Sequence, residues 1–278
     1  MNDWQCFDVS MDGGVAHVRM NHPERHNSMV PAFWSELPRV MRWLDEAGGV
    51  RVMVLSSLGR HFSAGMDLAV FESAGTLGTA SVKAREQFRQ QLKKLQESFN
   101  AIAQARFPVI AAVQGGCIGG GVDLATACCL RYATRDAYFC IHEINIGMMA
   151  DVGTLNRMPK QIPDAVMREL AYTGDRLGAE RAERLGFVNG LFDDPEALVA
   201  GALAVARRIA AKAPVAIATT KEMIDYARDH SVAESFAYLN ALQPGVFDPE
   251  DIARAMVAQK GRQPAQFADL APIKPALG

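Results

Sequence analysis

The sequence predicts an α/β fold in which a core of alternating strands and helices is followed by a C-terminal part made of helices alone. Two observations support this class. Short apolar runs rich in β-branched residues alternate with amphipathic helical stretches up to about residue 190. Beyond that point four helical stretches follow without a strand between them. We therefore expect a core domain over residues 1–195 and a C-terminal helical region over residues 196–278.

The core is expected to begin with a hairpin and a helix. Strands at residues 6–9 and 15–20 flank a glycine-containing turn at 11–14. Ser28 is a candidate N-cap of the next helix. Pro31 suits the first turn of that helix, because an N–H group there would have no helical partner.

The remaining elements are predicted from apolar runs, which indicate strands, and from helical spacing of apolar residues, which indicates helices. A long amphipathic helix is expected over Thr79–Ala105, where apolar residues recur at steps of three and four. Another helix is expected directly after the glycines near residue 120. Buried strands are expected at 52–55, 109–113, 130–133 and 138–141, and C-terminal helices at 197–212, 219–230, 231–241 and 249–259.

Composition argues against several classes of function. Charged residues make up 22% of the 278 residues and the net charge is −2, so neither nucleic acid nor an anionic membrane surface is an expected partner. No apolar run reaches the roughly 18 residues of a spanning helix, and the N-terminus does not resemble a secretory signal. The five cysteines have no metal-ligand spacing, which favours reduced thiols in a cytoplasmic protein without a bound metal.

Two glycine-containing segments directly follow buried strands and are candidate binding loops. Residues 59–68 have small side chains at their centre, so a ligand oxygen could reach a backbone N–H group. Residues 115–124 bring three consecutive glycines into a helix, at a cost of up to about 1 kcal/mol each. Close approach of a ligand to the helix N-terminus would offset that cost. A plain loop and tight packing are the respective alternatives, and the glycine spacing does not fit a dinucleotide fingerprint.

Three carboxyl groups lie near these loops in the sequence. Asp123 falls in the first turn of the glycine-entered helix, Glu143 follows the strand 138–141, and Asp151 lies eight residues further on. Their neighbours are apolar, and burial would raise a carboxyl pKa toward the range useful for proton transfer. Structural roles are the alternative for each: Asp123 with the helix dipole, Asp151 as an N-cap and Glu143 at the surface.

These motifs together resemble those of the crotonase (enoyl-CoA hydratase/isomerase) superfamily. The resemblance rests on Phe-Ser-Ala-Gly-Met-Asp-Leu at residues 62–68, on residues 110–124 and on the loop 21–28, and it covers nearly the whole chain. It implies a core built as a spiral of ββα units, and a C-terminal helical region that forms trimers or hexamers of two trimers. It also implies an acyl-coenzyme A thioester as ligand, with no separate cofactor.

The resemblance assigns roles to individual residues as well. It implies an oxyanion hole made by the backbone N–H groups of Ala64 and Gly120, which would stabilise a thioester enolate. It further implies that the substrate's pantetheine and thioester lie against Ser63, Ala64, Gly65, Met66, Asp67 and Gly120.

The carboxyl groups indicate which reaction to expect. Typical hydratases of the family have glutamates at the positions of Asp123 and Glu143, and glycine at that of Asp151. The pattern here instead resembles the Δ3,5-Δ2,4-dienoyl-CoA isomerase subfamily of fatty acid β-oxidation, as does the sequence of residues 150–160. Two carboxyl groups can serve the two distant ends of a dienolate. We therefore expect Glu143 and Asp151 to move the protons, with Asp123 tuning Glu143 or positioning the substrate.

Two rival functions are compared with this expectation. An enoyl-CoA hydratase with Asp123 in place of a glutamate is the enzymatic alternative. Some relatives of the family bind RNA, which would need a lysine-rich helix face. The helix expected over residues 79–105 carries Glu86 and Glu97 among its basic residues, which argues against that role.

Overall fold

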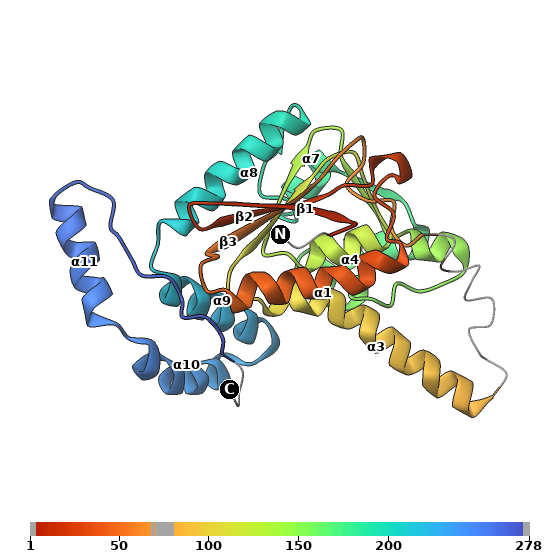
Figure 1. Cartoon of the computed structure of the whole chain (residues 1–278). Helices are drawn as coiled ribbons and strands as arrows, with labels where there is room; N and C mark the ends of the chain where they lie inside the picture. The colour runs from red at the N-terminus through yellow and green to blue at the C-terminus, as the bar shows by residue number, and fades with distance from the viewer. Residues whose placement is uncertain (1–3, 68–69, 71–80, 275–278) are drawn as a thin grey trace.

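A β-hairpin begins the main sheet of the computed structural model, which describes residues 4–67, 70 and 81–274 (Figure 1). β1 (Phe7–Asp12) pairs antiparallel with β2 (Val15–Met20). Gly13 and Gly14 have φ angles of 55° and 79° in the turn, a backbone region that glycine enters at little cost. The predicted hairpin is therefore confirmed.

Every later strand pair of this sheet is parallel, and the strand order is β1-β2-β3-β4-β6-β9. Parallel neighbours need crossover connections, and helices supply most of them. The strands are β3 (Val52–Ser57), β4 (Val109–Val113), β6 (Leu130–Thr134) and β9 (Leu191–Phe192). The first three match predicted strands to within two residues, whereas β9 was not predicted.

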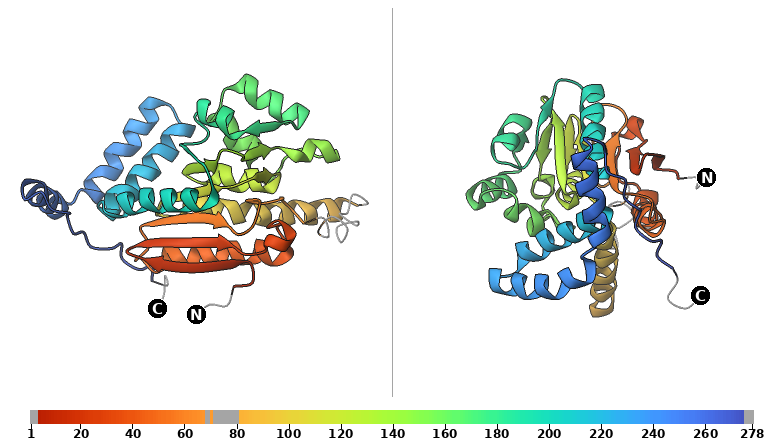
Figure 2. Two further views of the ribbon diagram at one scale, coloured as in Figure 1. Left: turned by 90° about the horizontal axis from the view of Figure 1, so that it is seen from above. Right: turned by 90° about the vertical axis from the view of Figure 1, so that its left-hand side faces the viewer.

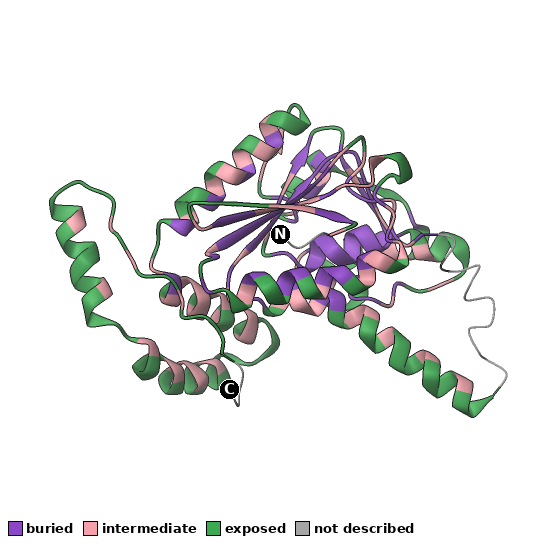
Figure 3. Cartoon of the chain, viewed as in Figure 1, coloured by how far each residue is buried: buried purple, intermediate pink, exposed green. Residues whose placement is uncertain are grey.

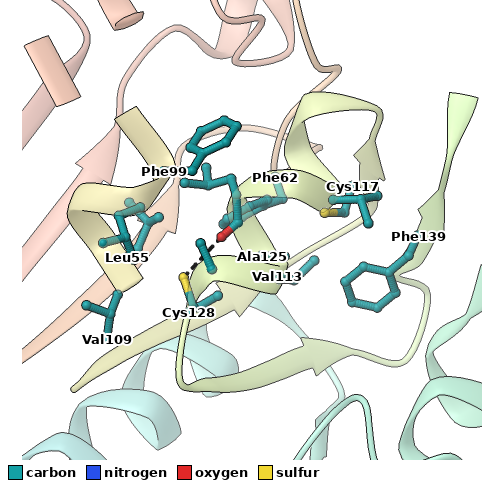
Figure 4. Close-up of a cluster of buried hydrophobic side chains, with 14 of the residues drawn as sticks. Leu55, Phe62, Phe99, Val109, Val113, Cys117, Ala125, Cys128 and Phe139 are labelled. Carbon is teal, nitrogen blue, oxygen red and sulfur yellow. Dashed lines mark hydrogen bonds between the residues drawn. The ribbon is translucent and has the colours of Figure 1, made fainter. Parts of the chain in front are cut away.

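Helices cover both faces of this sheet (Figures 1 and 2), and alternate residues of its central strands belong to two different apolar clusters. On one face, Val52, Val54 and Ile110 pack against the small apolar side chains of α8 (Pro195–Ala210). The other face is covered by α1 (Pro31–Glu46), α3 (Val82–Gln104) and α4 (Gly120–Ala127). Figure 4 shows this larger core, in which Phe99 of α3 and Ala125 of α4 lie near Leu55, Val109 and Val113 of the sheet.

A second, three-stranded sheet has the order β5-β7-β8, with β5 parallel to β7 and β7 antiparallel to β8. It comprises β5 (Gly116–Ile118), β7 (Tyr138–Cys140) and β8 (Arg176–Gly178). β5 lies within residues 115–124, where a candidate binding loop was expected, because three residues beginning with glycine carry no readable alternation. β5 runs almost directly into α4, so it positions the N-terminus of that helix.

The N-caps of α1 and α3 differ from the predicted helix starts. α1 has Val30, not Ser28, as its N-cap, so the Ser28 prediction is wrong. The Ser28 hydroxyl instead donates a hydrogen bond of 2.7 Å to the Asp67 carboxylate. α3 is capped by Ser81, whose hydroxyl accepts from the Ala84 N–H at 3.1 Å. Residues 79 and 80 of the helix predicted there, and Leu68 of the predicted loop, lie outside the described residues.

Shorter elements connect the second sheet to the C-terminal helices. They are the 3-10 turns Pro23–Arg25, His142–Ile146 and Met158–Lys160, and the helices α5 (Thr154–Arg157), α6 (Asp164–Thr173) and α7 (Ala179–Arg184). The α/β class with helices at the C-terminal end is thus confirmed.

The C-terminal helices α9 (Pro214–Asp229), α10 (Val232–Val246) and α11 (Pro249–Lys260) lie to one side of the sheets, and α11 stands away from them (Figure 1). Figure 3 shows α10 and α11 mostly exposed, with only a few half-buried positions. The chain then returns to α1, where the Ile273 N–H donates to the Glu46 carbonyl at 3.0 Å. α8 falls in the predicted C-terminal region but packs on the sheet, and the boundary at residue 195 stays a prediction. Within the described ranges, no helix is both long enough and apolar enough to cross a bilayer.

Candidate active site

The loop after β3 is held between two other segments of the chain. On one side, Ser63 pairs with β5, through Ser63 N–H to Gly116 O at 3.2 Å and Ile118 N–H to Ser63 O at 3.0 Å. On the other side, the Met29 N–H donates to Gly65 O at 2.8 Å. Segments distant in sequence therefore fix both edges of this loop.

Asn27 locks the N-terminal loop onto the same region. Its side-chain amide donates to Leu58 O at 2.8 Å and to His61 O at 2.9 Å, and its side-chain oxygen accepts from the His22 N–H at 3.1 Å. Its φ angle is 52°, a region that asparagine tolerates better than most residues. The Ser63 hydroxyl also donates to the Asn27 carbonyl at 2.8 Å. The loop 21–28 thus has a structural basis for its association with the 62–68 motif.

The backbone N–H groups of this loop point in different directions. The Ala64 N–H donates to the His26 carbonyl at 2.9 Å, so it is already bonded. Gly65, at φ 85°, turns the chain before Met66. Among the described residues, neither the Met66 N–H nor the Gly120 N–H has an acceptor. The structure thus corrects the predicted pair: Met66, not Ala64, has a free N–H group beside Gly120.

The two free N–H groups are close neighbours. A methyl group added at Gly120 would lie 3.6 Å from the Met66 nitrogen, and one added at Gly65 would lie 3.2 Å from the Gly120 nitrogen. Gly120 is also the first residue of α4, so its N–H group shares in the partial positive charge of the helix N-terminus. This pair of donors can bind one oxygen that carries negative charge.

A cleft of about 1240 Å³ opens in front of these donors. Its lining includes most of the predicted binding residues, namely Ala64, Gly65, Met66, Asp67 and Gly120, together with Glu143. Ser63 lies beneath the surface, where its hydroxyl accepts from the Gly65 N–H at 3.1 Å and so supports the loop. Asp123 and Asp151 are not among the residues that line the described part of the cleft.

Glu143 directly adjoins the donor pair. It follows β7 in the turn His142–Ile146, and its Oε1 would lie 3.2 Å from a methyl group added at Gly119. Its Oε2 is buried and has no hydrogen-bond partner in the described part of the chain. Burial raises the pKa of Glu143 to about 7, and the negative charges of Asp123 and Asp151 act in the same direction. A carboxyl group of this kind can exchange a proton near neutral pH.

Asp123 lies behind Glu143 in the first turn of α4 and is only 1% exposed. One carboxyl oxygen accepts from the Thr154 N–H at 2.5 Å, whereas the other is buried without a partner among the described residues. Burial raises the pKa of Asp123 to about 6, although the hydrogen bond from the Thr154 N–H and the charge of Arg157 oppose this.

Asp151 precedes α5 and is half-buried, and burial raises its pKa as well. Its backbone carbonyl accepts from the Gln96 side chain of α3 at 2.8 Å. The charge of Asp151 acts on both Asp123 and Glu143, so the structure brings the three predicted carboxyl groups into one electrostatic cluster.

Basic side chains lie at other places along the cleft wall. Arg25 is 52% exposed at its side chain and forms an ion pair of 2.8 Å with Asp67. Arg176 lies over the Tyr138 ring, with its guanidinium carbon 4.2 Å from the ring centre. No described group of three or more His, Cys, Asp or Glu residues has an arrangement suited to a metal ion.

Residues 10–270 match the sequence profile of the family described as enoyl-CoA hydratase/isomerase. The chain belongs to this family. Its relatives in the family include a human protein named Delta(3,5)-Delta(2,4)-dienoyl-CoA isomerase, mitochondrial, with 39% identity over 247 residues, 88% of this chain and 75% of that protein. A peroxisomal protein of the same name from Arabidopsis thaliana is 36% identical over 276 residues, 97% of this chain and 99% of that one.

Solved structures of enoyl-CoA hydratases have the same fold as this family member. The enzyme from Bacillus anthracis superposes with a TM-score of 0.85 at 26% identity, covering 95% of this chain and 99% of the other. The enzyme from Mycobacterium tuberculosis H37Rv gives a TM-score of 0.81 at 32% identity, with coverage of 95% and 98%. The predicted crotonase-type fold is thereby confirmed.

Two features of the site were not predicted from the sequence. The free N–H group of Met66 could not be recognised, because its direction depends on the turn at Gly65. The hydrogen bonds of the Asn27 side-chain amide are made with residues more than 30 positions away. The only sequence signal for them was the match of the loop 21–28 to the family pattern.

Proposed function

We propose that this protein is a Δ3,5-Δ2,4-dienoyl-CoA isomerase of fatty acid β-oxidation, which shifts two conjugated double bonds of an acyl-CoA thioester by one position. The observation that carries the proposal is the third carboxyl group, Asp151, coupled electrostatically to Asp123 and Glu143 beside a pair of free N–H groups. The names of the human and Arabidopsis relatives support the same activity.

The backbone donors stabilise the charge that develops on the substrate. When a proton leaves C2 of the 3,5-dienoyl thioester, the electron pair spreads along the diene and onto the thioester oxygen. The N–H groups of Met66 and Gly120 bind that oxygen, and each such donor contributes roughly 3–4 kcal/mol in the transition state. The cleft in front of them accommodates the acyl and pantetheine chains.

The carboxyl groups carry the proton between the two ends of the diene. One of Glu143, which lines the cleft, and Asp151, which lies outside its described lining, removes the C2 proton as a carboxylate, and the other delivers a proton to C6 as a carboxylic acid. The double bonds then lie at C2 and C4, and the two carboxyl groups have exchanged protonation states. The reaction balances with protons alone, so we propose no cofactor beyond the CoA of the substrate. Asp123 tunes Glu143 through its charge.

The experiment is a direct comparison of two reactions by the purified protein. A 3,5-dienoyl-CoA is supplied and the product is followed by ultraviolet absorbance, since a 2,4-diene conjugated to the thioester absorbs at longer wavelength. Crotonyl-CoA hydration is measured in parallel. Isomerisation should be fast in the wild-type protein. Asp151→Asn should lose isomerisation and bind the thioester as tightly as the wild type. Hydration without isomerisation would refute the proposal and favour a hydratase.

The C-terminal helices support a proposal about assembly. Large apolar side chains are exposed there, including Phe236 at 60%, Phe247 at 56% and Val257 at 71%. Patches of this kind on soluble proteins mark interaction surfaces. We propose that they join copies of this chain into a trimer or a hexamer of two trimers, which light scattering of the purified protein tests. The names of the relatives give mitochondria or peroxisomes as the location of those proteins, and the cytoplasmic location stays a prediction.

A further inference from the structure

A guanidinium group that does not line the described part of the main cleft interacts electrostatically with Asp123. Arg157 ends α5 and is half-buried. Its Nη2 donates to the side-chain oxygen of Asn100 on α3. Its Cζ lies 3.0 Å from the position of a methyl group added at Gly153, so the guanidinium rests against the backbone there. Its Nη1 is buried and has no partner in the described residues.

The same turn of chain holds the Asp123 carboxyl group. Gly153, which the guanidinium covers, directly precedes Thr154, whose N–H donates to Asp123 at 2.5 Å. Arg157 makes no direct ion pair with a described residue, so its charge reaches Asp123 across the turn. This interaction is attractive, whereas that between Asp123 and Asp151 is repulsive. Charge interactions across a dry interior are stronger than in water.

The other charged groups near Arg157 have partners of their own. Arg228 of α9 opposes the charge of Arg157, but it forms ion pairs with Asp225 and with Asp229. Lys160 also pairs with Asp229. Arg228, Lys160 and Asp229 line a polar cavity of about 340 Å³ together with Arg157. Arg228 and Lys160 thus have carboxylate partners of their own, whereas Arg157 has none in the described part of the chain and interacts with the charge of Asp123.

We propose that Arg157 is a positioning residue: it anchors the turn before α5 to α3 and keeps the buried Asp123 carboxyl group ionised. An ionised Asp123 repels a second negative charge on Glu143, so the exchangeable proton resides on Glu143 or Asp151 and not on Asp123. Proton transfer between the two ends of the substrate requires that distribution. The catalytic part of this inference rests on the proposed function.

The experiment first measures Asp123 in the protein without substrate. The protein is labelled with 13C at the aspartate carboxyl groups, and the Asp123 signal is assigned by its loss in Asp123→Asn. Arg157→Gln should raise the titration midpoint of this signal by about 1 unit, because an opposite charge has been removed from a buried carboxyl group. Arg157→Lys keeps the positive charge, so its Asp123 titration midpoint should stay close to that of the wild type. Arg228→Gln, which removes a neighbouring cation that is already paired, is the matched control and should not raise the midpoint.

The isomerisation assay then provides the second readout. In Arg157→Gln the acid limb of the kcat profile should move to higher pH by the same interval, with KM changed less than about twofold. The fall in kcat should be about twofold at pH 7 and approach about tenfold on the acid limb. A purely structural role would lower kcat at every pH and leave the limb in place. An unshifted Asp123 midpoint in the folded variant overturns the inference.

The outcomes also separate this inference from the proposed function. A shifted midpoint in a protein that isomerises no dienoyl-CoA would refute the function and retain the coupling between Arg157 and Asp123. If Arg157→Gln does not fold, Asn100→Ala provides the test. It removes the hydrogen bond that holds the guanidinium to α3 and keeps the positive charge of Arg157. The Asp123 midpoint should then rise by part of the expected shift, and an unchanged midpoint counts against the inference.

Discussion

Replacing Gly65 by alanine should disable the donor pair while leaving the fold intact. The new methyl group would lie 2.7 Å from the Ile118 carbonyl oxygen and 3.2 Å from the Gly120 nitrogen. Both neighbours are backbone atoms, so the contact can be relieved only by moving β5 and α4 away from the loop. That movement separates the Met66 and Gly120 N–H groups.

The substitution should lower both the free energy of unfolding and kcat. Alanine at φ 85° is strained by roughly 1–2 kcal/mol, which lowers stability. Loss of one oxyanion donor costs roughly 3–4 kcal/mol in the transition state, which corresponds to a fall in kcat of about 10²–10³-fold. Gly13→Ala is a matched control, because Gly13 also has a positive φ of 55° and no neighbouring atom lies within 4 Å of the added methyl group.

The assay combines kcat for dienoyl-CoA isomerisation with urea unfolding of both variants. Both variants should lose the stability that strain at a positive φ costs, Gly65→Ala should lose more because of its backbone contacts, and only Gly65→Ala should lose activity. A folded Gly65→Ala protein with kcat within twofold of the wild type would show that these two N–H groups do not bind the reacting oxygen.

Other outcomes follow from the same structure. Because the pKa of Glu143 is raised to about 7 in the folded protein, this group stabilises the fold fully below its ordinary pKa of 4.5 and loses that contribution as pH rises through 7. Glu143→Gln should therefore remove much of the decline in the free energy of unfolding between pH 5 and 8, by at most about 3 kcal/mol, and urea titrations that show an unchanged decline would contradict this. Asn27→Ala should lower the free energy of unfolding by about 3 kcal/mol, since its side chain makes three hydrogen bonds, and the exposed Asn156→Ala is the control in the same urea measurement. Gly119→Ala, at φ 52° and with its methyl group 3.2 Å from the Glu143 carboxylate, should lower kcat at least tenfold with little change in thioester binding by calorimetry; equal loss of binding and kcat would argue for general damage.

The strands of the main sheet were predictable because their residues report burial directly. Val109–Val113 is apolar throughout, and both of its faces are covered by helices in the structure. β5 was not predictable from composition, since its strand character comes from pairing with Ser63 and with β7. Short strands of this kind are set by tertiary contacts and not by local preference.

The site shows the same division between local and distant information. Glycines at 119–121 and the apolar surroundings of Asp123 and Glu143 were readable, because residue type alone suggests close backbone approach and burial. The choice between Ala64 and Met66 was not readable, since the His26 carbonyl that engages Ala64 comes from another part of the chain. Ser28 was misassigned for a related reason: its hydroxyl has a long-range partner, Asp67, that competes with a capping role.

The loop that carries Met66 is held by two isolated β-bridges, Met29 with Met66 and Ser63 with Cys117. In the Met29 bridge the bonds are made by the Gly65 carbonyl and the Asp67 N–H, so the N–H of Met66 itself points away from Met29. Those bonds are made within the chain itself, so the N–H dipoles need not reorient when negative charge develops on a thioester oxygen. The free energy that orders the loop thus comes from folding, and substrate binding is spared that entropic loss.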